Sequence, residues 1–147
     1  MLQAIYVARR YILLEIYLFE SGTVANRFID ALAAATRRGV DVRVLLDDFG
    51  ARGLSRYDRV RLSESGVHLA FYNPLYVSKL LHNLARDHRK LLVVDGEVAF
   101  VGGAGIADEF DPPGFPERRW RETVVKMRGP VIADWQELFV ESWQRYT

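Results

Sequence analysis

The order of apolar and polar segments along this chain predicts an α/β fold. Residues 11–19, 40–46 and 67–72 are short apolar segments rich in β-branched and aromatic residues, which is typical of buried strands. Residues 24–35 carry apolar side chains at helical spacing, and residues 55–65 form a charged segment of helical length. Strands that alternate with helices favour parallel pairing through right-handed crossovers. We therefore expect a mixed, mostly parallel sheet with helices on both faces.

The second half of the chain predicts a hairpin and a closing helix. Two short apolar strands, at residues 90–94 and 97–101, are joined by Asp95-Gly96, a dipeptide typical of tight turns. The other expected elements are a short helix at residues 2–10, an irregular or partly helical lid at 75–87 that follows the break at Asn73-Pro74, a strand at 120–127 and an amphipathic helix at 131–146.

Length and composition indicate an ordinary globular protein. The 147 residues suit one domain, which we assign to residues 1–147, and half of them are apolar. The absence of cysteine excludes disulfides, thiolate nucleophiles and cysteine-ligated metals. Twenty basic residues against nineteen acidic ones leave a formal charge of +1, so the field of the whole molecule does not by itself predict a nucleic-acid partner.

No segment has the length and apolarity of a membrane span. The longest candidate, residues 11–19, is far shorter than the ~20 apolar residues that a span requires, and it contains Glu15. The first residues lack the basic region, apolar run and cleavage site of a secretory signal, and their abrupt entry into helical sequence suggests a trimmed domain. We expect a cytoplasmic protein or one bound peripherally to the cytoplasmic membrane.

His88 and Lys90 are the first candidates for chemistry. Residues two apart in a strand point to the same side, so these two side chains would share one face while Arg89 points away. An imidazole can attack phosphorus or move a proton, and an ammonium can stabilise the oxygens of the transition state. Such a pair needs neither a cofactor nor a metal. Taken alone, however, the triplet is more often a solvated basic run at the start of a strand.

A longer window favours the chemical reading. The string HRKLLVVD at residues 88–95, followed by GGAG at 102–105, resembles the HxKxxxxD…G[SG]xN signature of the phospholipase D superfamily. The segments LEIYLF at 14–19, RRGVDVR at 37–43 and WRET at 120–123 are similar to bacterial cardiolipin synthases, and their amino-terminal catalytic half is the most similar part. The resemblance implies a phospholipase D-like domain with one copy of the motif.

The resemblance also implies roles for the motif residues. His88 would be the nucleophile that forms a phosphohistidine, or the acid that protonates the leaving oxygen, and Lys90 would bind the phosphate. Glu122 is our candidate for the carboxylate that orients His88, with a surface glutamate as the alternative. Asp95 is the third letter of the catalytic motif, yet its odd separation from His88 and the following Gly96 favour a structural role in the turn.

Four further residues bear on substrate binding. Gly102 and Gly103 are expected to line the phosphate site, where their backbone amides would be available. Gly105 stands where the family carries asparagine, so one expected phosphate ligand is missing, which can cost on the order of 3 kcal/mol of barrier lowering. We place Glu15 among the substrate-binding surroundings, paired with an arginine or lysine, because an unpaired carboxylate in an apolar strand would be costly to bury. His68 and His82 receive no chemical role.

One motif makes only half of the expected active centre. The family mechanism joins two histidines on opposite sides of phosphorus, and the loss of the general acid typically costs 10²–10⁴-fold. The second half-site could come from a homodimer, from the missing part of a longer chain or from a different partner. The resemblance to an amino-terminal half favours the longer chain.

Three functions remain open from the sequence. The leading one is phosphatidyl transfer or phospholipid hydrolysis at a peripheral membrane site, with the apolar lid at residues 75–81 admitting acyl chains. The second is a metal-independent nuclease acting as a homodimer, suggested by the arginines of the segment from Arg52 to Arg61, although Asp58 and the neutral net charge weaken it. The third is a non-catalytic lobe that completes a partner's site.

Overall fold

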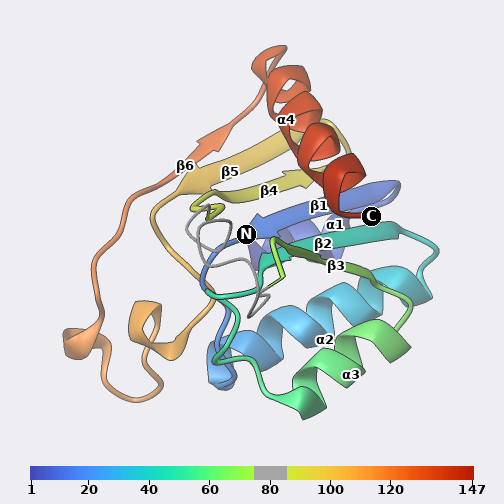
Figure 1. Cartoon of the computed structure of the whole chain (residues 1–147). Coiled ribbons are helices and arrows are strands. Elements are labelled where there is room, and N and C mark those ends of the chain that lie inside the picture. Colours follow the sequence, from blue (N-terminus) through green and yellow to red (C-terminus); the bar gives the residue numbers. More distant parts are fainter. Residues whose placement is uncertain (75–85) are drawn as a thin grey trace.

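A mixed six-stranded sheet forms the centre of the computed structural model, which describes residues 1–74 and 86–147 (Figure 1). The strand order is β3-β2-β1-β4-β5-β6. The predicted mixed sheet is confirmed, but only two of its five strand pairs, β1–β2 and β2–β3, are parallel. The other three pairs, β1–β4, β4–β5 and β5–β6, are antiparallel. For β4–β5 this follows from the tight turn, because so short a connection cannot return a strand in parallel.

The strands and helices follow the predicted segments with small shifts at their ends. The predicted strand at residues 11–19 is shorter in the structure, and the closing helix has the predicted bounds. The predicted lid at 75–81 and His82 lie outside the described residues. The elements are α1 Leu2–Val7, β1 Tyr11–Ile16, α2 Thr23–Arg37, β2 Asp41–Asp47, α3 Arg56–Glu64, β3 His68–Tyr72, β4 Lys90–Val94, β5 Val98–Gly102, β6 Val124–Met127 and α4 Val131–Tyr146.

Helices cover both faces of the sheet, as predicted. Helices α1, α2 and α3 lie on one face and α4 crosses the other (Figure 1). Alternate residues of each strand supply the two cores: Ile12 and Leu14 belong to the α2 side, whereas Leu13, Leu91 and Val93 pack on the α4 side. No helix in the described part of the chain is both long and apolar enough to cross a bilayer.

The long connection from β5 to β6 is tied to the start of α2. The N-cap of α2 is Gly22, which has no side chain to accept hydrogen bonds from the first backbone N–H groups of the helix. Asp108, in the short 3₁₀ helix Asp108–Phe110, takes this role: its carboxylate accepts hydrogen bonds from the backbone N–H groups of Thr23 at 3.1 Å and Val24 at 2.8 Å. The connection that carries Glu122 is therefore anchored on α2.

Asp95 joins the β4–β5 turn to the start of β1. Its carboxylate accepts hydrogen bonds from the backbone N–H groups of Arg9, Arg10 and Tyr11 at 2.8–3.0 Å. Burial acts to raise the pKa of Asp95, but the three N–H donors outweigh it and the pKa is lowered. The turn places both Asp95 and Gly96 at positive φ. This third letter of the motif therefore sits at the end of β4 remote from His88, with a structural set of contacts.

Replacing Asp95 with alanine is expected to lower the free energy of unfolding at pH 7 by about 2 kcal/mol, because three backbone donors lose a charged acceptor. The deficit should shrink as the pH falls below the ordinary aspartate range, where wild-type Asp95 also becomes protonated. Urea unfolding at pH 7 and pH 3 measures both effects. Equal stability of the two proteins at pH 7 would contradict the structural role.

Candidate active site

His88 and Lys90 lie together where β4 begins. Lys90 is the first residue of β4, and His88 precedes it in an extended segment. The Lys90 Nζ atom lies 3.3 Å from His88 Nδ1 and donates a hydrogen bond of 2.9 Å to the carbonyl oxygen of His88. This contact confirms the prediction, made from their spacing, that the two side chains share one face. Arg89 points to the other face, where it contacts α4.

The side chains of His88 and Lys90 line a cavity of about 320 Å³. The ring of Tyr17, which follows β1, lies 4.6 Å from the His88 ring between centroids, and Lys90 Nζ lies 5.3 Å from the Tyr17 ring centroid. Trp120 is exposed at the rim. The lining combines one imidazole, one ammonium, two carboxylates and aromatic surface. It consists of Tyr17, Leu18, His88, Lys90, Gly103, Glu109, Phe110, Trp120 and Glu122.

Lys90 is the cation of this cavity. It is only 9% exposed, and burial lowers the pKa of its ammonium, while the charges of Glu122 and Asp87 act in the opposite direction. A poorly hydrated ammonium gains more from an anionic ligand than a fully hydrated one, because less water has to be displaced. The site is therefore suited to an anion that can reach Lys90 beside His88.

Glu122 enters the same cavity from the segment before β6. Its Oε1 atom accepts a hydrogen bond of 3.3 Å from Trp120 Nε1, and its charge acts on Lys90. In the described part of the chain no hydrogen bond joins Glu122 to His88; the contact to His88 Nδ1 is made by Lys90. The structure thus brings Glu122 to the predicted place without the predicted bond.

The glycines of the motif provide space for this arrangement. A Cβ atom on Gly103 would collide with Oε2 of Glu122, so glycine at 103 is what admits the carboxylate. The N–H of Gly103 donates to the carbonyl oxygen of Thr123 at 3.1 Å. The prediction that this N–H is available to a phosphate is therefore wrong. Gly102 is part of β5, packed against Thr123, and it does not line the cavity.

Gly105, at the position of the family asparagine, is not among the residues that line the cavity. A Cβ atom there would lie 2.8 Å from Leu18 Cβ and 2.9 Å from the Leu18 carbonyl oxygen. The backbone beside it is also fixed, because the N–H of Ile106 donates to that same oxygen at 2.9 Å. An asparagine at 105 would therefore require Leu18 to move.

Glu15 does not reach the cavity, contrary to its assignment to the substrate-binding surroundings. Strand alternation places it on the α4 face, fully buried, opposite Leu91 of β4. The predicted arginine partner is present: Arg89 NH2 lies 3.4 Å from Glu15 Oε1. Neither carboxylate oxygen of Glu15 has a hydrogen bond within the described residues.

The protonation of Glu15 follows from this environment. Burial raises its pKa to about 9, the neighbouring Asp87 adds to the rise, and Arg89 acts against it. Arg89 is shared with Asp87, whose Oδ1 lies 3.2 Å from Arg89 Nε. Glu15 is therefore neutral at pH 7 despite its short distance to the guanidinium of Arg89.

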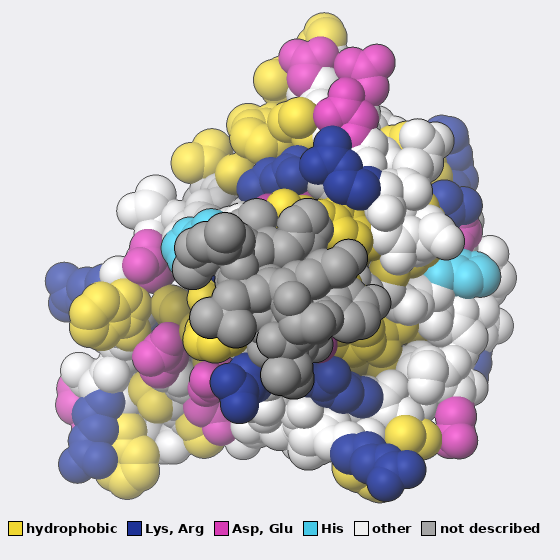
Figure 2. Space-filling view, viewed as in Figure 1, with side chains coloured by type: hydrophobic (Ala, Val, Ile, Leu, Met, Phe, Trp, Pro, Cys, Tyr) yellow, Lys and Arg dark blue, Asp and Glu magenta, His cyan; other side chains and the backbone are white. Residues whose placement is uncertain are grey.

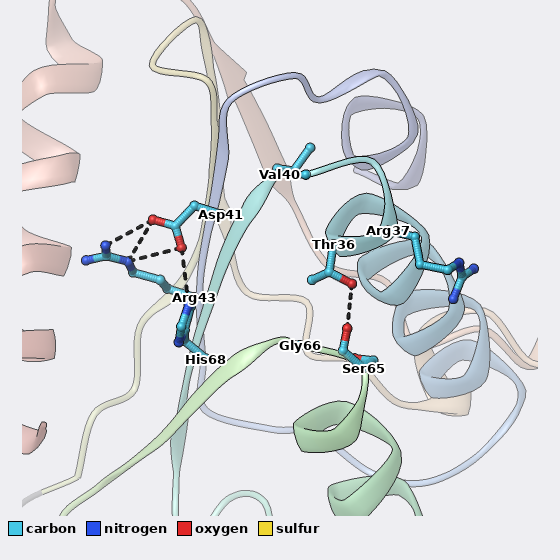
Figure 3. A pocket seen from close by; sticks show the side chains of 9 residues that line it. Thr36, Arg37, Val40, Asp41, Arg43, Ser65, Gly66 and His68 are labelled. Atoms are coloured by element: carbon cyan, nitrogen blue, oxygen red, sulfur yellow. Dashed lines mark hydrogen bonds and ion pairs between the residues drawn. The ribbon is translucent and has the colours of Figure 1, made fainter.

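A second cavity, of about 470 Å³, lies at the opposite end of the parallel strands and does not contain the motif (Figure 3). His68 lines it, exposed, with its Nε2 atom 3.8 Å from Asp41 Oδ1. Asp41 also pairs with Arg43 at 3.0 Å. Asp41, Arg43 and His68 are thus engaged with one another, and the geometry gives His68 no part in the chemistry near His88.

Sequence reasoning missed Tyr17, Trp120 and Asp87. The sequence predicts Tyr17 and Trp120 within strands, but β1 ends at Ile16 and β6 begins at Val124, so both aromatic residues lie outside the strands and line the cavity. The sequence places Asp87 at the end of the predicted lid. Its position beside the motif was the available signal, since a carboxylate next to a basic triplet is a natural partner for it.

Comparison with known proteins agrees with this geometry. Residues 1–143 match the family described as "Cardiolipin synthase, PLD-like domain". Cardiolipin synthase 1 of Bacillus anthracis is 32% identical over 143 residues, which cover 97% of this chain and 28% of that protein. Cardiolipin synthase of Alkalihalophilus pseudofirmus is 34% identical over 147 residues, 99% of this chain and 29% of that protein. The chain spans less than a third of the length of either synthase.

A solved structure shows the same fold. The phospholipase D family member Nuc from Salmonella typhimurium superposes with a TM-score of 0.72 at 21% identity, covering 99% of this chain and 86% of that one. The fold predicted from the order of segments and from the motif is therefore confirmed.

The buried Glu15 predicts an unusual dependence of stability on pH. Because its pKa is near 4.5 when unfolded and about 9 when folded, unfolding releases a proton between these values, and its contribution to stability falls as the pH rises through this window. Glu15→Gln removes the ionisable group, so the variant should gain on wild type between pH 5 and 9, reaching a few kcal/mol. Urea unfolding across this range measures the difference. Parallel pH profiles for the two proteins would contradict a neutral Glu15.

Proposed function

Because this chain belongs to the cardiolipin synthase family of phospholipase D-like domains, we propose that it supplies one half of an active centre that transfers a phosphatidyl group through a phosphohistidine. The observation that carries the proposal is the contact between His88 and the buried ammonium of Lys90 at the mouth of a cavity. A nucleophile next to a fixed positive charge is what phosphoryl transfer requires.

The reaction has two steps. An imidazole nitrogen of His88 attacks phosphorus with its lone pair, a nitrogen–phosphorus bond forms, and the bond from phosphorus to the leaving alcohol oxygen breaks as an acid group gives that oxygen a proton. Water or a lipid alcohol then attacks phosphorus, gives its proton to the same group and displaces His88. Lys90 stabilises the charge on the non-bridging oxygens in both steps.

The proton on His88 is governed by Lys90 and Glu122. An ammonium only donates hydrogen bonds, so Nδ1 accepts from Lys90 and the imidazole proton lies on Nε2. When a phosphate oxygen accepts the hydrogen bond of the Lys90 ammonium in place of Nδ1, the imidazole can lose its Nε2 proton to solvent and take up a solvent proton at Nδ1. Glu122, which lines the same cavity, is the acceptor we assign to that Nδ1 proton. The lone pair is then on Nε2, and Glu122 steadies the charge that develops on the ring.

The acid group for the leaving oxygen is assigned to a second half-site. Hydrophobic side chains gather over β6 and the neighbouring end of α4 on the face shown in Figure 2. Val125 of β6 and Trp120 are 52% and 62% exposed, and Trp120 also lines the cavity with Glu122. A partner that covers this segment would bury apolar surface and place its own histidine opposite His88.

The substrate we propose is a phospholipid, reached at a membrane surface. The two relatives compared above, from Bacillus anthracis and Alkalihalophilus pseudofirmus, are named cardiolipin synthases. The alternative of a nucleic-acid substrate depends on the arginines of the segment from Arg52 to Arg61. Of these, Arg61 pairs with Asp30 at 2.8 Å and Asp58 at 2.9 Å, and Arg59 lies 3.9 Å from Asp48. The pairing of these two arginines within the protein weakens the predicted basic surface.

The histidine mechanism is tested with a substrate that needs no acid. Radiolabelled bis(4-nitrophenyl) phosphate has a good leaving group, so the single half-site should become labelled in a rapid-quench experiment. His88→Asn should lose the label, and Lys90→Met should slow labelling by on the order of 10²-fold, because the charge on the phosphate oxygens loses its partner. His68→Asn, at an exposed site outside the cavity, is the control. Label that persists in His88→Asn would exclude His88 as the nucleophile.

The substrate class is tested by direct comparison. At concentrations that allow two copies of the chain to pair, phosphatidylglycerol in mixed micelles should be converted faster than a single-stranded oligonucleotide, with equal rates with and without EDTA. Thin-layer chromatography of the lipid and gel analysis of the DNA measure the two reactions. Faster cleavage of DNA would favour the nuclease, and EDTA-sensitive turnover would contradict the metal-independent mechanism.

A further inference from the structure

Arg89, the middle residue of the motif triplet, is held by four groups on the face of the sheet opposite the cavity. Its guanidinium donates to Ser142 Oγ at 2.7 Å, to the Leu138 carbonyl oxygen at 3.3 Å and to Asp87 Oδ1 at 3.2 Å, and it lies 3.4 Å from Glu15 Oε1. Ser142 and Leu138 belong to α4. A single side chain thus connects the motif, β1 and α4.

We infer that Arg89 is a positioning residue for His88, acting through the backbone from the reverse face of the sheet. This inference rests on the proposed function of the cavity. It assigns to the Arg89 network the task of fixing where the imidazole stands relative to Lys90.

The first argument is that His88 has no regular element of its own. It is exposed and lies in the extended segment before β4, so the position of its ring depends on the backbone of its two neighbours. The backbone of both neighbours, Asp87 and Arg89, is held by hydrogen bonds. The N–H of Asp87 donates to Asp47 Oδ2 at 3.1 Å, and the carbonyl oxygen of Arg89 accepts from the N–H of Tyr17 at 3.1 Å.

The second argument is that the network closes around His88. The same oxygen of Asp87 that meets the Arg89 guanidinium also accepts the Arg89 backbone N–H at 3.1 Å. Residues 87 and 89 are therefore linked through both backbone and side chain, with His88 between them. Residues 87–89 are also joined to α4, because Arg89 donates to Ser142 Oγ. Ser142 is itself buried and donates to the Leu138 carbonyl oxygen.

The third argument concerns the residue type. Arginine presents five donors in a planar fork, which suits the simultaneous contacts to a carboxylate, a hydroxyl and a carbonyl. Lysine would keep the charge but meet fewer of these acceptors. An arginine needed only to neutralise Asp87 would not have to reach two residues of the last helix.

The inference is tested with Arg89→Lys, which keeps the charge, and Ser142→Ala, which removes one anchor on α4. Arg43→Met is the matched control: Arg43 also lies beside α4, over the Trp143 ring, but it pairs with Asp41 and does not contact the motif. The measurements are the unfolding midpoint in urea, the His88 ring resonances by NMR, assigned with His88→Asn, and the affinity for inorganic phosphate followed by the same resonances.

In Arg89→Lys the chain should remain folded while the His88 resonances shift and phosphate binding weakens on the order of tenfold, because a misplaced ring no longer cooperates with Lys90. Ser142→Ala should give a smaller change in the same direction, and Arg43→Met should leave both quantities unchanged even if its unfolding midpoint falls. Arg89→Lys with wild-type resonances and affinity would overturn the inference. A wild-type chain whose His88 resonances ignore phosphate would instead contradict the proposed function, while the comparison of resonances among the variants would still decide the role of Arg89.

Discussion

The alternation of side chains across residues 87–90 is the constraint on which the site depends. His88 and Lys90 project to the cavity, whereas Asp87 and Arg89 project to the α4 side of the sheet. One short segment therefore carries the reactive groups on one face and their anchors on the other. The pairing of β4 with β1, through Ile16 opposite Lys90, fixes which face is which. A shift of register by one residue would exchange the two sets.

Much of the fold and part of the site could be predicted from the sequence, because they depend on local patterns. Strand and helix segments follow from apolar periodicity, and the contact of His88 with Lys90 follows from their spacing. The direction of β4–β6 depends on which strands pair, and the face of Glu15 depends on its register with Leu91. Both are long-range properties. The hydrogen bond from the Gly103 N–H to the Thr123 carbonyl oxygen is a third long-range property, since it depends on how β6 pairs with β5.

The buried polar groups Glu15, Asp87 and Arg89, on the α4 face of the sheet, lower the stability of the fold by their desolvation, and the rest of the fold must offset this free energy. Glu15 and Asp87 are buried close together beside a single guanidinium, and burial together with the neighbouring Asp87 raises the pKa of Glu15 so that Glu15 stays protonated. An apolar residue at 15 would pack in the same strand without this cost. The carboxyl group of Glu15 does, however, lie 3.4 Å from the Arg89 guanidinium, on the same side of the sheet as the Arg89 contacts with α4.

Two glycines of the motif, Gly103 and Gly105, limit which groups of this chain can bind a phosphate. The Gly103 N–H donates to Thr123, and the Glu122 carboxylate occupies the space where a side chain at 103 would lie. An asparagine at 105 would collide with the Cβ atom and the carbonyl oxygen of Leu18. The motif therefore offers a phosphate one ammonium and one imidazole from this chain, where the family pattern also has an amide. Because each missing donor raises the barrier, a transition state held by Lys90 alone on this side needs further donors from the opposite side. Under the proposed function, the second half-site that would supply the acid is thus also the source we expect for the missing phosphate contacts.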